Sequence, residues 1–100
     1  MEKHTAHDDL KAVGVTATQR GTDAFTRLAL QGIDAMGLSQ AEGLAVVLHQ
    51  QAGMFYKSMT THADHRVWQD VYHAPCPNGK LAYIKVTVHA GATVIQFKER

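Results

Sequence analysis

Two alternating runs near the end of the sequence constrain the fold most strongly. Residues 82–88 (AYIKVTV) and 93–98 (TVIQFK) alternate apolar and polar side chains, as strands with one buried face do. The short segment between them, with Ala90-Gly91 as a two-residue turn, predicts an antiparallel hairpin. In this register the opposed residues are Tyr83 and Lys98, Ile84 and Phe97, Lys85 and Gln96, and Val86 and Ile95. One face is then aliphatic, and the polar face is suited to holding a phosphodiester.

Two upstream segments also read as strands. Residues 55–60 (FYKSMT) and 67–72 (VWQDVY) are rich in aromatic and β-branched side chains. Alternation places Lys57 on the same side as Phe55 and Met59, and it places Gln69 with Val67 and Val71. If these sides line up with the polar face of the hairpin, Lys57 and Gln69 converge with Tyr83, Lys85 and Lys98. The alternative is that all of them are ordinary solvated residues on the wet side of a sheet.

The first half of the chain carries helix signals. Thr5-x-x-Asp8 can cap a first helix that ends near Gly14, and Thr22 or Asp23 can start a second that Gly37 ends. Ser39-x-x-Glu42 is the signature of a capping box at the start of a third helix. Residues 15–18 are a candidate edge strand. The side chains expected to face the core are Leu10, Val13, Phe25, Leu28, Ile33, Met36, Leu44, Val47 and Leu48.

Helices followed by strands predict an α+β fold, an antiparallel β-sheet with N-terminal helices packed on one face. One hundred residues correspond to a single domain over 1–100. The sequence has no apolar run of about 18 residues and no signal-peptide pattern at its start, so we expect a cytoplasmic protein without a membrane span. The only cysteine, Cys76, lies between two prolines and is read as a loop thiol.

Charge is unevenly distributed along the chain. Residues 1–50 hold four Lys and Arg against six Asp and Glu, whereas residues 51–100 hold six against three. The predicted sheet is therefore the half that attracts anions. The net charge of +1 favours a small anionic site over a broad surface that coats nucleic acid.

The strand segments also resemble a known family. FYKSMTT at 55–61, Asp64-His65 and then WQDVY at 68–72 are similar to the central block of the MqsR (motility quorum-sensing regulator) family. Further matches are Met1-Glu2-Lys3, Thr5, His7, Tyr83, Lys85, Thr87, Val88, His89 and Phe97-Lys98-Glu99. The similarity covers essentially the whole chain and is loosest over residues 14–54.

MqsR proteins are bacterial type II toxins that act as mRNA interferases. The resemblance therefore implies a RelE-like toxin fold and an endoribonuclease that cuts single-stranded mRNA at short GC-containing sites such as GCU without the ribosome. The implied products are a 2′,3′-cyclic phosphate and a 5′-hydroxyl, and the implied catalytic residues are Lys57, Gln69, Tyr83 and Lys98. The implied partner is an antitoxin of the MqsA type, a zinc-containing DNA-binding protein, and DNA is contacted only through it. We expect no metal and no cofactor in the toxin itself.

The residues themselves fit such chemistry. RNA supplies its own nucleophile, the 2′-hydroxyl, so the protein must provide a base, an acid and cations that stabilise the crowded phosphate. Clustering of Lys57, Lys85 and Lys98 would lower the pKa of one lysine by like-charge repulsion, which leaves the identity of the base open. Tyr83 can donate a proton or hydrogen bond, and Gln69 can hold a phosphate oxygen or read a base edge.

Four further residues are expected to bind substrate: Tyr56, Met59, His73 and Lys85. Tyr56 and Met59 suit contact with an unstacked base. His73 stands where the family carries arginine, so a titratable imidazole replaces a permanent cation, and the loop 74–79 is stiffened by two prolines. Trp68 falls on the opposite side from Gln69 and is expected in the core.

Other readings of the sequence remain open. His4-x-x-His7 and His62-x-x-His65 have the spacing of metal-ligand pairs but lack a third ligand nearby. His65 and His89 match the family and can serve as acid, base or structural hydrogen-bonding groups. A non-catalytic RNA-binding or regulatory module on the same sheet is the alternative to an enzyme. A DNA-binding regulator ranks last, because no basic helix-turn-helix pattern is present.

Overall fold

The computed structural model describes residues 1–90 and 92–100. Over this part of the chain, a five-stranded sheet has the order β1-β2-β3-β4-β5 with antiparallel neighbours throughout. Its strands are β1 (Glu2–Lys3), β2 (Phe55–Thr60), β3 (Trp68–Pro75), β4 (Leu81–His89) and β5 (Ala92–Glu99). The helices are α1 (Leu10–Arg20), α2 (Arg27–Ala35), α3 (Gln40–Leu48) and the short 3-10 helices η1 (Gly21–Ala24) and η2 (Ala52–Met54).

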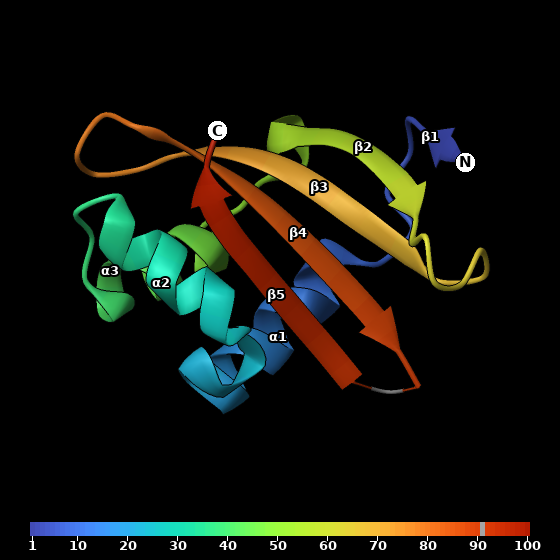
Figure 1. Cartoon of the computed structure of the whole chain (residues 1–100), viewed down its shortest axis with the longest axis horizontal. Helices are drawn as coiled ribbons and strands as arrows, with labels where there is room; N and C mark the ends of the chain where they lie inside the picture. The colour runs from blue at the N-terminus through green and yellow to red at the C-terminus, as the bar shows by residue number, and fades with distance from the viewer. Residues whose placement is uncertain (91) are drawn as a thin grey trace.

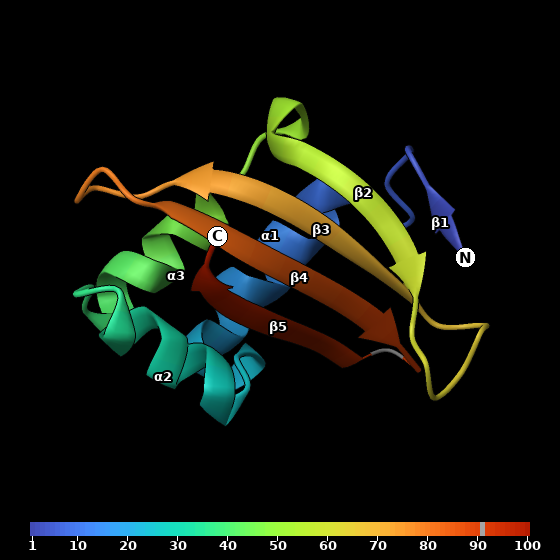
Figure 2. The same cartoon turned by 45° about the horizontal axis from the view of Figure 1, so that its top comes forward.

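The predicted α+β architecture is confirmed. Helix α1 passes behind β5 in Figure 1, α3 packs against α1 and α2, and α2 runs beside the edge strand β5. Figure 2 shows the same arrangement from a second direction, with the opposite face of the sheet left uncovered by helices. The core between helices and sheet includes Val13, Ala17, Ile33, Met36, Val47, Tyr72, Ile84, Val86, Ile95 and Phe97. The RelE-like relationship stays a prediction.

The hairpin register is confirmed for all four predicted pairs, from Tyr83 opposite Lys98 to Val86 opposite Ile95. Pairing continues to His89 opposite Ala92. Of the predicted turn Ala90-Gly91, Ala90 has a positive φ of 52°, and Gly91 lies outside the described residues. Ile84 and Val86 of β4 and their partners Phe97 and Ile95 of β5 are all buried, so the side chains of both strands alternate between the core and the other face as predicted.

Strand β2 contains a bulge that the sequence did not indicate. Phe55 pairs with Tyr72 and Lys57 with Val71, so Tyr56 is the extra residue. The bulge turns Phe55 toward the core, where its ring meets that of Tyr72 edge-on at 5.6 Å. The prediction that Phe55 shares a side with Lys57 is therefore wrong.

Helix α1 differs from the prediction at both ends. Asp9, and not Thr5 or Asp8, is the N-cap, and the helix continues through Gly14 to Arg20. An interior glycine costs a helix only about 1 kcal/mol, which the burial of Val13 and Ala17 against the core outweighs. The candidate edge strand at 15–18 is thus helical.

Helix α2 starts later than predicted, because residues 21–24 form η1 and Thr26 supplies the cap by accepting a hydrogen bond from the Ala29 N–H at 3.0 Å. With this start Ala29, Ile33 and Met36 face the core, while Leu28 is 76% exposed. Leu48 at the end of α3 is also exposed, so both leucines were wrongly assigned to the core.

The predicted features at Gly37 and Ser39 are confirmed. Gly37 directly follows the C-cap of α2 and has a φ of +79°, which suits glycine. The capping box of α3 is complete: Ser39 N donates to Glu42 Oε1 at 2.8 Å, and Glu42 N donates to Ser39 Oγ at 3.1 Å.

The segment before α1 is held against the sheet, a connection that sequence periodicity did not reveal. Strand β1 pairs with β2 at the sheet edge. The buried carboxylate of Asp70 accepts hydrogen bonds from the backbone N–H groups of His7 (3.0 Å) and Asp8 (2.8 Å). None of the helices among the described residues is long and apolar enough to cross a bilayer.

Candidate functional site

The site is built on the open face, which we define as the outward side chains of β2 to β5 on the side away from α1 and α3. Strand pairing arranges them in three adjacent rows. The middle row contains Lys57, Val71, Lys85 and Gln96. The row on one side contains His73, Tyr83 and Lys98, and the row on the other contains Met59, Gln69 and Thr87.

The expected convergence is therefore found, although the roles of these residues stay predictions. Rows two residues apart along a strand share a face, so the three form one continuous surface. The bulge adds Tyr56, whose ring stacks on His73 with centroids 4.3 Å apart. All eight predicted residues lie on this face: Tyr56, Lys57, Met59, Gln69, His73, Tyr83, Lys85 and Lys98.

Aromatic rings line one end of the open face. His73 lies between Tyr56 and Tyr83, with centroid distances of 4.3 and 5.7 Å. The ammonium of Lys98 lies 5.1 Å from the centre of the Tyr83 ring. This order places a cation next to a phenol and the phenol next to a stacked pair of rings, which suits binding of phosphate beside a base.

Lys57 has an acidic partner from strand β1. Its Nζ donates to Glu2 Oε1 at 2.7 Å, and this hydrogen bond is the main cause of a raised Lys57 pKa. The same contact lowers the pKa of the Glu2 carboxyl. Repulsion among lysines therefore does not make Lys57 a base, and its side chain remains a cation at neutral pH.

The lowered lysine pKa predicted from sequence is found at Lys85. Partial burial in the middle row is the main cause, and the nearby charge of Lys98 adds to it. Both effects disfavour the charged form. Of the three lysines on the open face, Lys85 is thus the one whose pKa moves toward the range of a proton acceptor.

The polar groups around the lysines are also held in place. Gln69 donates from Nε2 to Thr87 Oγ1 at 3.2 Å, a contact across β3 and β4. Burial lowers the pKa of His73, and the charge of Arg100 contributes. The lowered pKa favours the neutral imidazole, so His73 is not a permanent cation of the open face.

Trp68 lies on the other face of the sheet from Gln69, as predicted, but the prediction that it belongs to the core is wrong. The ring is half-buried, stacks on His7 with centroids 5.7 Å apart, and has Lys3 Nζ at 4.2 Å from its centre. These partners belong to the N-terminal segment, which covers this end of the sheet.

A pocket of about 250 Å³ adjoins the open face, between β4, β5 and the first turn of α2. The α2 side supplies Thr26, Leu28 and Ala29, and the sheet side supplies Tyr83, Lys85, Gln96, Phe97 and Lys98. Leu28 was not predicted as a site residue because it was predicted to lie in the core. Thr26 as the N-cap could have indicated its true place. In a helix that starts there and buries Ala29 and Ile33, Leu28 falls outside the buried face.

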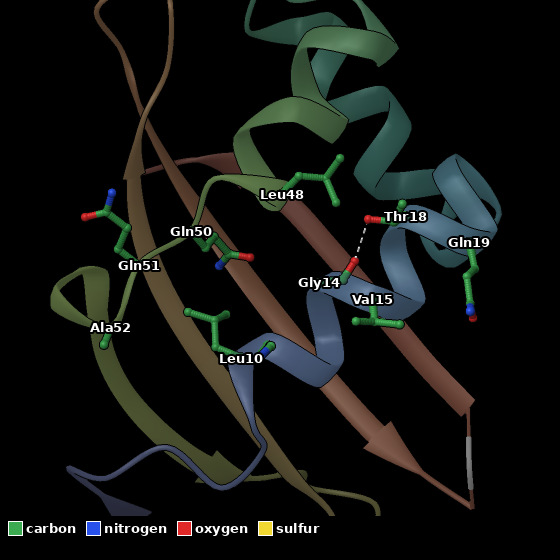
Figure 3. A pocket seen from close by; sticks show the side chains of 10 residues that line it. Leu10, Gly14, Val15, Thr18, Gln19, Leu48, Gln50, Gln51 and Ala52 are labelled. Atoms are coloured by element: carbon green, nitrogen blue, oxygen red, sulfur yellow. Dashed lines mark hydrogen bonds between the residues drawn. The ribbon is translucent and has the colours of Figure 1, made fainter.

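A larger groove of about 650 Å³ lies elsewhere, between α1 and the segment that leaves α3. Figure 3 shows the Gln50 side chain pointing into it between Leu10 and Leu48. In the described part of the chain the buried Gln50 amide has no hydrogen-bond partner. Only Lys11 among the lining residues carries a charge, so the groove lacks the groups that phosphate chemistry needs.

Metal ligands and the thiol do not contribute to the open face. Within residues 1–90 and 92–100, no group of three or more His, Cys, Asp and Glu side chains is arranged to hold a metal ion. Cys76 follows β3 in a loop, as predicted, but its thiol is buried against the core, and burial raises its pKa.

Fold and site together define a class of protein, an α+β domain whose exposed sheet face combines ammonium groups, a phenol and stacked rings for work on a nucleic acid strand. The family described as "Motility quorum-sensing regulator, toxin of MqsA" matches residues 5–99. The chain therefore belongs to this toxin family, and the resemblance stated from the sequence is confirmed. A curated relative, the mRNA interferase toxin MqsR of Escherichia coli (strain K12), is 40% identical over 100 residues, which span 100% of both chains.

Proposed function

We propose that the protein is a toxin that cuts single-stranded mRNA on its open face without a metal ion and without the ribosome. The observation that carries this proposal is the pairing of Tyr83 with Lys98 next to the row of Lys57 and Lys85. A phosphodiester lying across these rows would meet the ammonium groups of Lys57 and Lys98, the Lys85 amine with its lowered pKa and the Tyr83 phenol. Family membership and the named activity of the E. coli relative support the same function.

The chemistry uses the substrate's own nucleophile. Lys85 accepts the 2′-hydroxyl proton, because its lowered pKa increases the neutral fraction available for this step. The 2′ oxygen attacks phosphorus, and the bond to the 5′ oxygen of the next nucleotide breaks. Tyr83 protonates this leaving oxygen, and the products are a 2′,3′-cyclic phosphate and a 5′-hydroxyl.

The remaining residues stabilise charge and hold the strand. Lys57 and Lys98 stabilise the crowded phosphate, and Gln69, oriented by Thr87, donates to a phosphate oxygen or a base edge. The half-exposed Tyr56 ring, backed by His73, provides a surface on which an unstacked base can lie, with Met59 beside it.

The finer properties follow from the family resemblance. The recognised sites are short GC-containing words such as GCU, and the enzyme acts on transcripts in the cytoplasm. Its partner is an MqsA-type antitoxin that contains zinc and binds DNA. The toxin reaches DNA only through this antitoxin.

The decisive experiment incubates purified protein with single-stranded RNA in EDTA and without ribosomes. Cleavage is expected, and Lys57→Ala and Tyr83→Phe should abolish it while Val15→Ala, at an exposed position of α1 away from the open face, should not. RNA that stays uncut but bound to the protein at high protein concentration would instead identify a non-catalytic RNA-binding module. Cleavage that requires an added metal ion would contradict the proposed chemistry.

A further inference from the structure

The pocket beside Tyr83 and Lys98 has a chemical character different from the rest of the open face. One wall is the first turn of α2 with the apolar side chains of Leu28 and Ala29. The other is the sheet, with the Gln96 amide between two lysines. At about 250 Å³ it is slightly smaller than the roughly 300 Å³ where pockets for drug-sized ligands begin, so it suits a single planar group.

The α2 wall is firmly attached to β5. Thr26 N donates to Ile95 O at 3.0 Å, and the Thr26 side chain caps the helix. Further along α2, Gly32 lies so close to β5 that an added Cβ would stand 2.2 Å from Phe97 O. The position of Leu28 relative to Gln96 is therefore set by backbone contacts and does not depend on the substrate.

The packing of α2 does not require a leucine at position 28. It is 76% exposed and lines the pocket together with Gln96, whereas Ala29 and Ile33 carry the packing of α2. A pocket lined by an apolar side chain, an amide and two ammonium groups matches one kind of ligand well. A nucleobase offers an apolar face for Leu28, a hydrogen-bonding edge for Gln96 and an attached phosphate for the lysines.

We propose that this pocket is a nucleobase subsite, in which Leu28 and Gln96 hold the base of one nucleotide that flanks the scissile phosphate. The inference rests on the proposed function, since it takes the phosphate beside Tyr83 and Lys98 as the point of cleavage. Leu28 and Gln96 are then specificity-determining residues, and part of the recognised word is read by α2 and β5. The rest of the word is read at the opposite end of the rows, near Tyr56.

The test combines protein variants with RNA copies in which one nucleotide lacks its base. Wild type, Leu28→Ala, Gln96→Ala and the control Val15→Ala are each tested for cleavage of a defined oligonucleotide and of a series of copies, each with one abasic position near the cleavage site. Val15 is a suitable control because it is an exposed apolar residue of a helix, as Leu28 is, but it lies on α1, away from the open face and the pocket. Melting curves establish that every variant is folded.

We expect Leu28→Ala to raise KM by about three- to tenfold with kcat nearly unchanged, because substrate contact and not chemistry is lost. At one position of the RNA, removal of the base should weaken cleavage by wild type and Val15→Ala. The same removal should have little further effect on Leu28→Ala, because the substitution and the missing base remove the same contact. Gln96→Ala should relax the preference for a particular base at that same position.

Two failures are distinguishable. If wild type cuts RNA but Leu28→Ala responds to every abasic copy as Val15→Ala does, the subsite is refuted and the proposed function stands. If wild type cuts no RNA, the proposed function fails, and binding of the same oligonucleotide series by fluorescence anisotropy decides about the pocket. If wild type then binds all copies of the RNA with equal affinity, the subsite is refuted in this case too.

Discussion

The close approach of α2 to β5 can be tested with one substitution, Gly32→Ala. The ideal Cβ at residue 32 would stand 2.2 Å from Phe97 O and 3.3 Å from Lys98 Cα. Both neighbours are backbone atoms, so they cannot rotate away as a flexible side chain would. Ordinary contact starts at 3.4 Å, and the helix must therefore move from the strand by about 1 Å.

The magnitude follows from two opposing terms. Alanine in place of an interior helical glycine stabilises by roughly 0.5–1 kcal/mol, whereas overpacking costs about 1–3 kcal/mol. The net effect is a destabilisation of about 1–2 kcal/mol, which lowers Tm by roughly 4–16 °C in a domain of this size. RNA cleavage should fall as well, because the displaced strand carries Lys98.

Gly14→Ala is the matched control. Gly14 is also interior to a helix, but an added Cβ there meets nothing within 4 Å. This variant should gain about 0.5–1 kcal/mol and keep full activity. Both are measured by urea and thermal unfolding followed by circular dichroism, together with cleavage well below Tm. A Gly32→Ala variant that is stabilised as much as Gly14→Ala would refute the contact.

Three further predictions concern the site and its support. Glu2→Gln replaces the carboxylate that raises the Lys57 pKa by a neutral amide, so cleavage should be lost at a less alkaline pH than in wild type; an unchanged pH–rate profile would mean that the Lys57 charge is not required. Lys85→Arg keeps the charge but cannot release a proton, so single-turnover cleavage should fall by about 100-fold or more while RNA affinity holds, and full activity would exclude Lys85 as the base. Asp70→Ala leaves the N–H groups of His7 and Asp8 without their acceptor, so urea unfolding should show a loss of about 1–3 kcal/mol, and hydrogen exchange should speed up in β1.

The sheet was more readable from the sequence than the helices. A slip of one residue in the hairpin would place Tyr83 and Lys85 in the core, so the hydrophobic pattern fixes the register. The first half offered several Thr and Asp residues that can each cap a helix, and only tertiary contact selects Asp9 and Thr26.

The features that periodicity missed depend on contacts between distant parts of the chain. The bulge at Tyr56 leaves no local sequence mark, yet it decides which ring reaches the open face. Strand β1 has two residues and pairs with a strand more than fifty positions away, so no window of sequence contains both. The Glu2 partner of Lys57 was invisible for the same reason, and with it the raised pKa of that lysine.

The order of strands in the sheet has a consequence for biosynthesis. The rows of the open face are completed by β4 and β5, the last elements in chain order, and Tyr83 meets Lys98 only when those two strands pair. Since a nascent chain leaves the ribosome from its N-terminus, the helices and β2 emerge while the cationic surface is still incomplete. If the protein cuts RNA on its open face, as proposed, cleavage can therefore begin only after β5 has been synthesised and has paired with β4.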